Sequence, residues 1–143
     1  MIRQVFVEFG APKKGTVYSD PTTDDLFGLF RDKNAALFVA LEEGRIAGCC
    51  GIYPTHGLPE GCTELVKYYL PAEARGKGIG KALLGKSVEA ALNLGYTSLY
   101  LESLPHFSRA LGIYKRMGFQ KLLAPLGASG HNGCTIWMNK TLI

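Results

Sequence analysis

A glycine-rich turn, set between an extended apolar segment and a helical one, constrains this chain more than any other feature. The turn reads Arg75-Gly76-Lys77-Gly78-Ile79-Gly80. Residues 62–70, before it, are rich in β-branched and aromatic residues and predict a strand, whereas residues 81–92 carry apolar residues at helical spacing. A turn that opens a helix leaves main-chain N–H groups unpaired at the positive end of the helix dipole. The sequence therefore predicts a binding site for a phosphate or pyrophosphate group.

Two familiar phosphate-binding loops do not fit this turn. A P-loop requires glycine where the chain has Arg75, and Ser or Thr where it has Ala82. A dinucleotide fingerprint that starts at the first or second glycine of the turn requires glycine or alanine at Lys81 or Leu83, respectively. The spacing therefore excludes both loops.

The pattern that the turn does satisfy is Arg/Gln-x-x-Gly-x-Gly/Ala, through Arg75, Gly78 and Gly80. It resembles the acetyl-CoA pyrophosphate loop of the GNAT N-acetyltransferase superfamily, although an ordinary strand–turn–helix explains these residues alone equally well. Residues 110–119 resemble the later motif of that superfamily, a helix that ends in Tyr-x-x-x-Gly-Phe. Both motifs stand in the right order, and the resemblance extends over about residues 37–138.

Composition fits one small enzyme domain over residues 1–143, with 47% hydrophobic residues and a net charge of +4. The basic excess is modest and spread along the chain, its middle cluster surrounds the turn, and no dense basic–aromatic run predicts nucleic-acid binding. The cysteines and histidines lack metal-ligand or disulfide-framework spacing. No apolar run approaches the ~20 residues that cross a membrane, and no signal peptide is recognisable. We therefore expect a cytoplasmic protein without a metal.

The predicted fold is α/β: a GNAT fold with a mixed, mostly antiparallel central sheet flanked by helices. We expect helices over residues 2–9, from the turn to about residue 94 and over residues 107–117, and a short one, capped by Thr22 or Thr23, that ends at Phe30. In the first of these, residues 5–7 taken alone are also compatible with a strand. The predicted strands are residues 35–41, 45–53, 62–70, 98–102, 119–123 and 135–142.

The resemblance implies that the opening strand of a GNAT domain is missing here. Such a domain normally opens with a strand and then a helix, and residue 1 corresponds to a position inside that helix. Either the sequence starts late or this edge strand is dispensed with. Since an absent edge strand leaves unpaired main-chain groups on its neighbour, we expect pairing with another chain, as a homodimer.

Acetyl transfer to an amine requires a base. An alkyl ammonium with a pKa near 10 is neutral only about 0.1% of the time at pH 7, a cost of roughly 4 kcal/mol. Glu64 stands at the spacing from Arg75 at which the histone acetyltransferase branch carries its glutamate base. The alternative is a glutamate that faces solvent or pairs with Lys67. Glu102 is a second carboxylate, suited to act as base or to hold a substrate ammonium.

Tyr114 corresponds to the family tyrosine that protonates, or donates a hydrogen bond to, the departing sulfur of CoA. A phenol with a pKa near 10 is a weaker acid than a thiol near 8.5, so full proton transfer is uphill by about 2 kcal/mol. We therefore expect a hydrogen bond, and a tyrosine that merely packs in the core is the alternative. Phe107 replaces the asparagine that the family often carries, which puts the usual polar contact to pantetheine in doubt.

By resemblance, acetyl-CoA is the co-substrate. Its pantetheine arm pairs with the main chain of the predicted strand, its diphosphate lies on the turn, and the side chain of Arg75 or Lys81 adds a phosphate contact. The cofactor-binding residues are Tyr68, Tyr69, Leu70, Arg75, Gly76, Lys77, Gly78, Ile79, Gly80 and Lys81.

The acceptor is expected to be a primary amine of a small molecule, an amino acid or a related amine, that attacks directly in a ternary complex. Residues 126–133 form a loop in the usual place for acceptor contacts, where His131 either acts on substrate or is simply solvated. Two alternatives stay open, namely an acceptor amine on a protein and an acyl-CoA-binding module without turnover.

Overall fold

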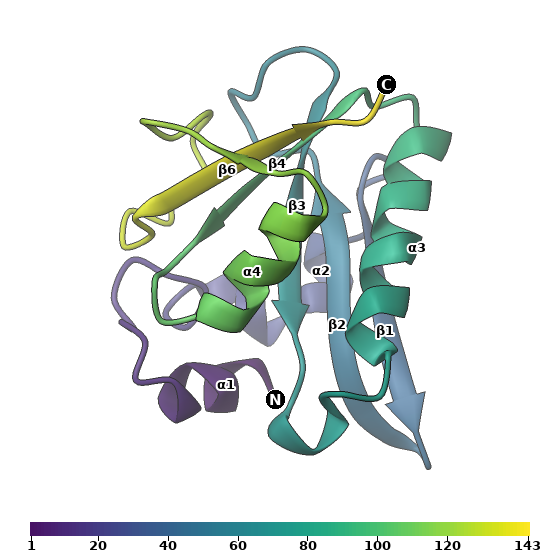
Figure 1. The fold of residues 1–143 in the computed structure, drawn as a ribbon, viewed down its shortest axis with the longest axis vertical. Helices are drawn as coiled ribbons and strands as arrows, with labels where there is room; N and C mark the ends of the chain where they lie inside the picture. Colours follow the sequence, from purple (N-terminus) through teal and green to yellow (C-terminus); the bar gives the residue numbers. More distant parts are fainter.

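The computed structural model describes residues 1–143, and its six strands form one mixed sheet in the order β1-β2-β3-β4-β6-β5 (Figure 1). All neighbouring strands are antiparallel except β3 and β4, which run parallel. The predicted mixed, mostly antiparallel sheet is thereby confirmed. The strands are β1 (Ala36–Glu42), β2 (Arg45–Tyr53), β3 (Cys62–Tyr69), β4 (Ser98–Ser103), β5 (Gln120–Lys121) and β6 (Ile136–Thr141).

Helices cover both faces of the sheet (Figure 1). One face packs against α3 (Ile79–Asn93) and α4 (Ser108–Arg116), and the other carries α1 (Ile2–Glu8), the short 3₁₀ helix η1 (Pro21–Asp24) and α2 (Leu26–Leu29). A further 3₁₀ turn, η2 (Ala72–Ala74), follows β3. No helix is both long enough and apolar enough to span a lipid bilayer. Two apolar clusters result, a larger one under α3 and α4 and a smaller one under α1.

Local sequence signals account for most element boundaries. The β1–β2 hairpin turns through Glu43 and Gly44, which both have positive φ (51° and 77°). Positive φ at both residues matches a two-residue turn to the right-handed twist of the two strands. The expected caps of the short helix are wrong. The carboxylate of Asp20 accepts a hydrogen bond from the Thr22 N–H, and that of Asp25 accepts one from the Gly28 N–H, so two aspartates begin two short helices.

A bulge in β3 and the divergence of β3 from β4 shape the site. Cys49 of β2 pairs with Tyr69, and Gly51 with Val66, so β3 carries an extra residue between these two pairs. The positive φ of Lys67, 58°, marks that bulge. The parallel pairing of β3 with β4 covers residues 62–64 alone, and beyond it the two strands separate. The chain therefore opens a gap in the middle of its own sheet.

The edge strand β1 is paired on one side only. Beside this edge, Val39, Leu41 and Ile46 are exposed apolar side chains, at 49%, 68% and 56% of their accessible surface. Interchain pairing at this edge stays a prediction.

Candidate active site

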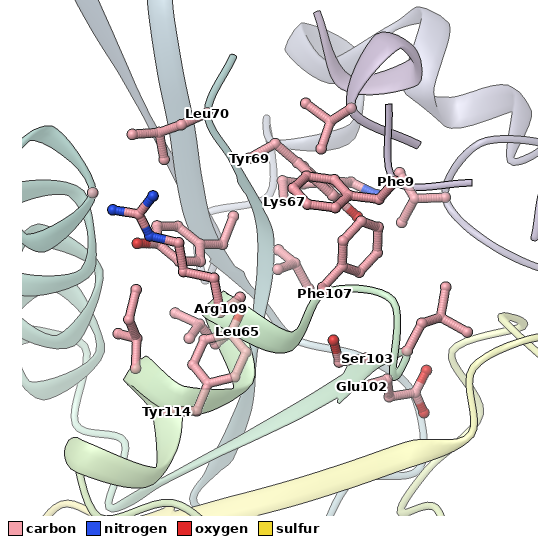
Figure 2. A pocket seen from close by; sticks show the side chains of 18 of the residues that line it. Phe9, Leu65, Lys67, Tyr69, Leu70, Glu102, Ser103, Phe107, Arg109 and Tyr114 are labelled. Atoms are coloured by element: carbon pink, nitrogen blue, oxygen red, sulfur yellow. The ribbon is translucent and has the colours of Figure 1, made fainter. Parts of the chain in front are cut away.

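The gap between β3 and β4 opens into a cavity of about 280 Å³ (Figure 2). Its walls come from α1, β3, the turn after β3, β4, α4 and the loop over residues 126–135. Figure 2 shows Arg109 and Tyr114 on one side of β3, and Lys67, Phe107 and Glu102 on the other. The cavity thus passes through the sheet and joins its two faces.

The glycine-rich turn forms one end of this cavity. Gly76 and Gly78 have positive φ angles of 77° and 85°, and open space lies where a Cβ atom would stand on either residue. None of the main-chain N–H groups of residues 76–81 donates a hydrogen bond within the protein. Since these groups crowd the N-terminus of α3, the turn offers a concave surface of free donors to an anion.

Gly80 allows α3 to approach β3 closely. A Cβ atom on Gly80 would lie 2.4 Å from the hydroxyl of Tyr68. The third glycine of the motif therefore serves packing, whereas the first two serve the conformation of the turn.

The side chain of Arg75 is engaged by the protein. Its Nη1 donates to the Glu8 carboxylate at 2.5 Å, its Nε and Nη2 donate to the Leu70 carbonyl at 3.2 and 2.9 Å, and its guanidinium lies 4.9 Å from the centre of the Phe9 ring. Arg75 thus fastens the turn to the end of β3 and to α1. The exposed Lys81 forms no ion pair and lines the cavity.

Tyr114 lies on the α4 side of the gap, 7% exposed. Its ring packs against Tyr68 and Phe119, with centroid distances of 6.0 and 5.8 Å, and the residue lines the cavity. Burial raises the pKa of its phenol well above the ordinary value of 10. The hydroxyl therefore stays protonated and has no hydrogen-bond partner in the protein.

Glu64 lies on β3 at the last pair before the strands separate, opposite Tyr100. It is only 4% exposed, so it does not face solvent, and it makes no ion pair with Lys67. Both alternatives considered from the sequence are therefore wrong. Burial, reinforced by the charge of Glu102, raises the pKa of Glu64 to about 7, although the 2.5 Å hydrogen bond that the Thr55 hydroxyl donates acts against this rise. A carboxyl in this range exchanges its proton readily near neutral pH.

Glu102 and His131 are tied to their surroundings rather than free. The Tyr100 and Ser129 hydroxyls donate to Glu102 at 2.6 and 2.5 Å. The Nε2 atom of His131 lies 2.7 Å from the Asp20 carboxylate. The main-chain N–H of His131 donates a hydrogen bond to Ser129 Oγ. His131 is therefore not a solvated loop residue. These contacts hold the loop over residues 126–133 against η1 and β4.

Asp20 keeps its charge in this network. Burial acts to raise its pKa, but hydrogen bonds from Thr22 and the contact with His131 outweigh burial and lower the pKa of Asp20 to about 2. Sequence reasoning missed Asp20, whose only signal was its place before Pro21 at a helix start.

An aromatic wall, formed by Phe6, Phe9, Tyr69 and Phe107, closes the α1 side of the cavity. The ring of Phe107 lies 5.3, 5.7 and 6.3 Å from those of Phe6, Phe9 and Tyr69. Where the family often carries a polar asparagine, Phe107 thus makes apolar contacts that join α1 to the start of α4.

The profile of the Acetyltransferase (GNAT) family matches residues 3–119 of this chain. The chain belongs to the GNAT family. This confirms the resemblance seen in the sequence and, with relatives named N-acetyltransferases, makes the protein an acyltransferase that uses acetyl-CoA as donor.

Relatives support the same family. The chain is 35% identical over 144 residues to the uncharacterised N-acetyltransferase YjgM of Escherichia coli, covering 99% of this chain and 86% of that protein. It is 33% identical over 92 residues to N-acetyltransferase 8B of Rattus norvegicus, covering 63% of this chain and 41% of that protein.

Solved structures show the same fold. An acetyltransferase of the GNAT family from Staphylococcus aureus superposes with a TM-score of 0.81 at 18% identity, covering 99% of this chain and 89% of that one. A phosphinothricin acetyltransferase from Sinorhizobium meliloti, in complex with AcCoA, gives a TM-score of 0.69 at 20% identity, covering 99% and 83% of the two chains.

The GNAT fold brings the residues singled out in the sequence around one cavity. Most of these residues line it, although they come from segments far apart in the chain: Glu64, Tyr68, Tyr69, Leu70, Arg75, Gly76, Gly78, Gly80, Lys81, Glu102, Tyr114 and His131. Two predicted cofactor-binding residues do not, since Lys77 forms an ion pair with Glu42 at 3.0 Å and Ile79 packs against the apolar cluster under α3 and α4. What the sequence did not single out as part of the site is Lys67, which had been considered only as a partner for Glu64. Its signal was a lysine between apolar and aromatic residues in the second half of the strand.

Proposed function

We propose that this GNAT acetyltransferase transfers the acetyl group of acetyl-CoA to a primary amine of a small molecule, by direct attack in a ternary complex. The observation that carries the proposal is a single cavity with free main-chain donors at one end and a buried carboxylate, Glu64, beyond the point where β3 leaves β4. A small acceptor is favoured because α1, the aromatic wall and the loop over residues 126–133 cover the side of Glu64.

Acetyl-CoA would bind along β3 and across the turn. The N–H groups of residues 76–81 receive the diphosphate, and Lys81 is the cation free to approach it, since the donors of Arg75 are used by Glu8 and Leu70. The edge of β3 that β4 leaves, over Tyr68–Leu70, pairs with the amide groups of pantetheine like an added strand.

Glu64 acts as the base in this proposal. An acceptor ammonium gives its proton to the Glu64 carboxylate, directly or through a water, and the neutral amine attacks the carbonyl carbon of the thioester. A carbon–nitrogen bond forms and the carbon–sulfur bond breaks, and the surplus proton of the nitrogen passes through water to the departing thiolate, which releases CoA and an N-acetylated product. The raised pKa of Glu64, about 7, makes its carboxylate basic enough to accept this proton while it remains partly ionised at neutral pH.

Tyr114 would stabilise the leaving thiolate. Because burial raises the pKa of its phenol above 10, transfer of its proton to a thiolate is more uphill than for an exposed tyrosine. We therefore assign to Tyr114 a hydrogen bond that strengthens as negative charge develops on sulfur, in a site with little water.

A coupled assay tests this function. Purified protein is titrated with acetyl-CoA by calorimetry, and thiol release is then followed with a panel of amino acids, other small amines and lysine-containing peptides. Turnover with small amines that falls at least ~100-fold in Glu64→Gln supports the proposal. Binding without release of thiol would favour the acyl-CoA-binding module, and release with peptides alone would favour a protein acceptor. No binding of acetyl-CoA by folded protein would refute the cofactor assignment.

We also propose that residues 1–143 act as one domain that forms a homodimer at the edge of β1. The free side of this strand and the exposed Val39, Leu41 and Ile46 support the proposal. Light scattering tests it: a monomer at micromolar concentration would contradict it, and Leu41→Lys is expected to dissociate the dimer.

A further inference from the structure

Lys67 is a buried cation whose presence the acetyl transfer proposed above does not explain. The residue is 6% exposed and lines the cavity. Leu65 and Tyr68 both face the apolar cluster under α3 and α4, while Tyr69 faces the cluster under α1. Because the bulge adds a residue to β3, Lys67 lies next to Tyr69 on the α1 side, and Asp20 and Glu64 are the carboxylates whose charges act on it (Figure 2).

The backbone of Lys67 is strained to hold it there. Its φ of 58° lies in the left-handed region, which a residue with a long side chain rarely adopts. Such strain is typical of positions at which the surrounding structure fixes a functional side chain.

No protein group neutralises the Lys67 ammonium by direct contact. It takes part in none of the ion pairs of the chain. The nearby carboxylates are occupied instead: Asp20 by Thr22 and His131, and Glu64 by Thr55. The Lys67 nitrogen is not sealed in the protein, because no fully buried side-chain nitrogen lacks a partner, so it reaches the space of the cavity. Burial lowers the pKa of Lys67, and an anion bound beside the ammonium would offset this cost.

We propose that Lys67 binds the carboxylate of the acceptor, so that the acceptor is an amino acid whose amine faces Glu64. The inference rests on the function proposed above and narrows its substrate class. Glu64 and Lys67 are three residues apart on β3, at most about 10 Å between their main chains because the bulge shortens the strand, and both side chains line the cavity. The aromatic wall beside them favours an apolar side chain on the acceptor.

The test compares each acceptor with its carboxamide. Thiol release is measured for wild type, Lys67→Met and Lys67→Arg with the twenty standard amino acids and with the amides of the best of them. We expect wild type to prefer the acid by ~10-fold or more in kcat/KM, as a charge-assisted contact implies. Lys67→Met should lose this preference, with a much larger rise in KM for the acid than for the amide, and Lys67→Arg should keep part of the preference. An equal loss for acid and amide would overturn the inference and leave the acetyltransferase proposal standing.

A second measurement does not depend on turnover. Binding of N-acetyl-L-methionine and N-acetyl-L-methioninamide to the CoA-loaded protein is followed by calorimetry, after thermal melting has verified that Lys67→Met is folded. Tighter binding of the acid by wild type, lost in Lys67→Met, supports the carboxylate site. It does so even if no amine is acetylated, because missing acetylation would refute only the proposed reaction. Equal binding of acid and amide by wild type, or binding of neither, overturns the inference.

Discussion

Replacing Glu64 by glutamine is expected to stabilise the protein at alkaline pH while it lowers turnover at least ~100-fold. The folded carboxyl has a pKa of about 7, against an ordinary value of 4.5. A difference of about 2.5 units corresponds to about 3 kcal/mol of folding free energy. The amide oxygen of glutamine can still accept the hydrogen bond that Thr55 donates, so the substitution removes mainly the buried charge.

The sign of the effect depends on pH. Below about pH 4.5 the carboxyl is protonated in both folded and unfolded chains, and its ionisation contributes nothing to stability. As the pH rises from 4.5 to 7, the unfolded chain loses this proton first, and the wild-type protein becomes progressively less stable. Above pH 7 the penalty is complete, so the advantage of Glu64→Gln should grow from near zero to about 3 kcal/mol.

Urea unfolding at pH 5 and pH 8.5 measures this difference. With a slope of about 2 kcal/mol per molar urea, the variant should unfold at ~1.5 M higher urea at pH 8.5 and at only ~0.4 M higher urea at pH 5, where the difference in stability is about 0.8 kcal/mol. Glu60→Gln, which changes an exposed carboxylate, should shift neither midpoint measurably. If the difference between Glu64→Gln and wild type does not change with pH, Glu64 is no buried carboxyl of raised pKa, and its assignment as base loses its support.

Further expectations concern the turn and the leaving group. Tyr114→Phe should lower kcat by ~10- to 100-fold with little change in the binding of acetyl-CoA, because the hydroxyl acts only as charge develops on sulfur. Steady-state kinetics measures kcat and calorimetry measures binding; weaker binding at an unchanged kcat would contradict this role. Gly78→Ala should weaken acetyl-CoA binding ~10-fold and destabilise the chain by about 1–2 kcal/mol, since φ is 85° there, whereas Gly85→Ala, on the exposed side of α3, should stabilise it by about 1 kcal/mol; equal effects in thermal melts would contradict this reading. The pH profile of kcat/KM should rise through about pH 7 as Glu64 ionises, and a profile that rises only with the pKa of the acceptor amine would assign the base elsewhere.

Features fixed by neighbouring residues were predictable from the sequence. The turn at residues 75–80, the helix that follows it and the β1–β2 hairpin depend on glycines and on short-range periodicity, and the structure shows all three. The caps at Asp20 and Asp25 were missed because threonines and aspartates compete for the same role within residues 20–25, and the sequence does not rank them.

Features that depend on distant segments were not predictable. The bulge at Lys67 arises from the register between β2 and β3, so strict alternation would have placed this lysine on the other face. The partner of Arg75 is Glu8, 67 positions away in the chain, and no local pattern indicates that pairing. The interpretation of Phe107 as a lost polar contact likewise could not anticipate the aromatic wall that it completes.

The position of Arg75 has a consequence for the order of events in catalysis. Its guanidinium joins the turn expected to receive the nucleotide to α1, the helix that roofs the opposite half of the cavity. Any displacement of the turn on nucleotide binding would therefore be transmitted to this roof. Such a linkage favours compulsory-order kinetics, with the thioester taken up first and the amine second.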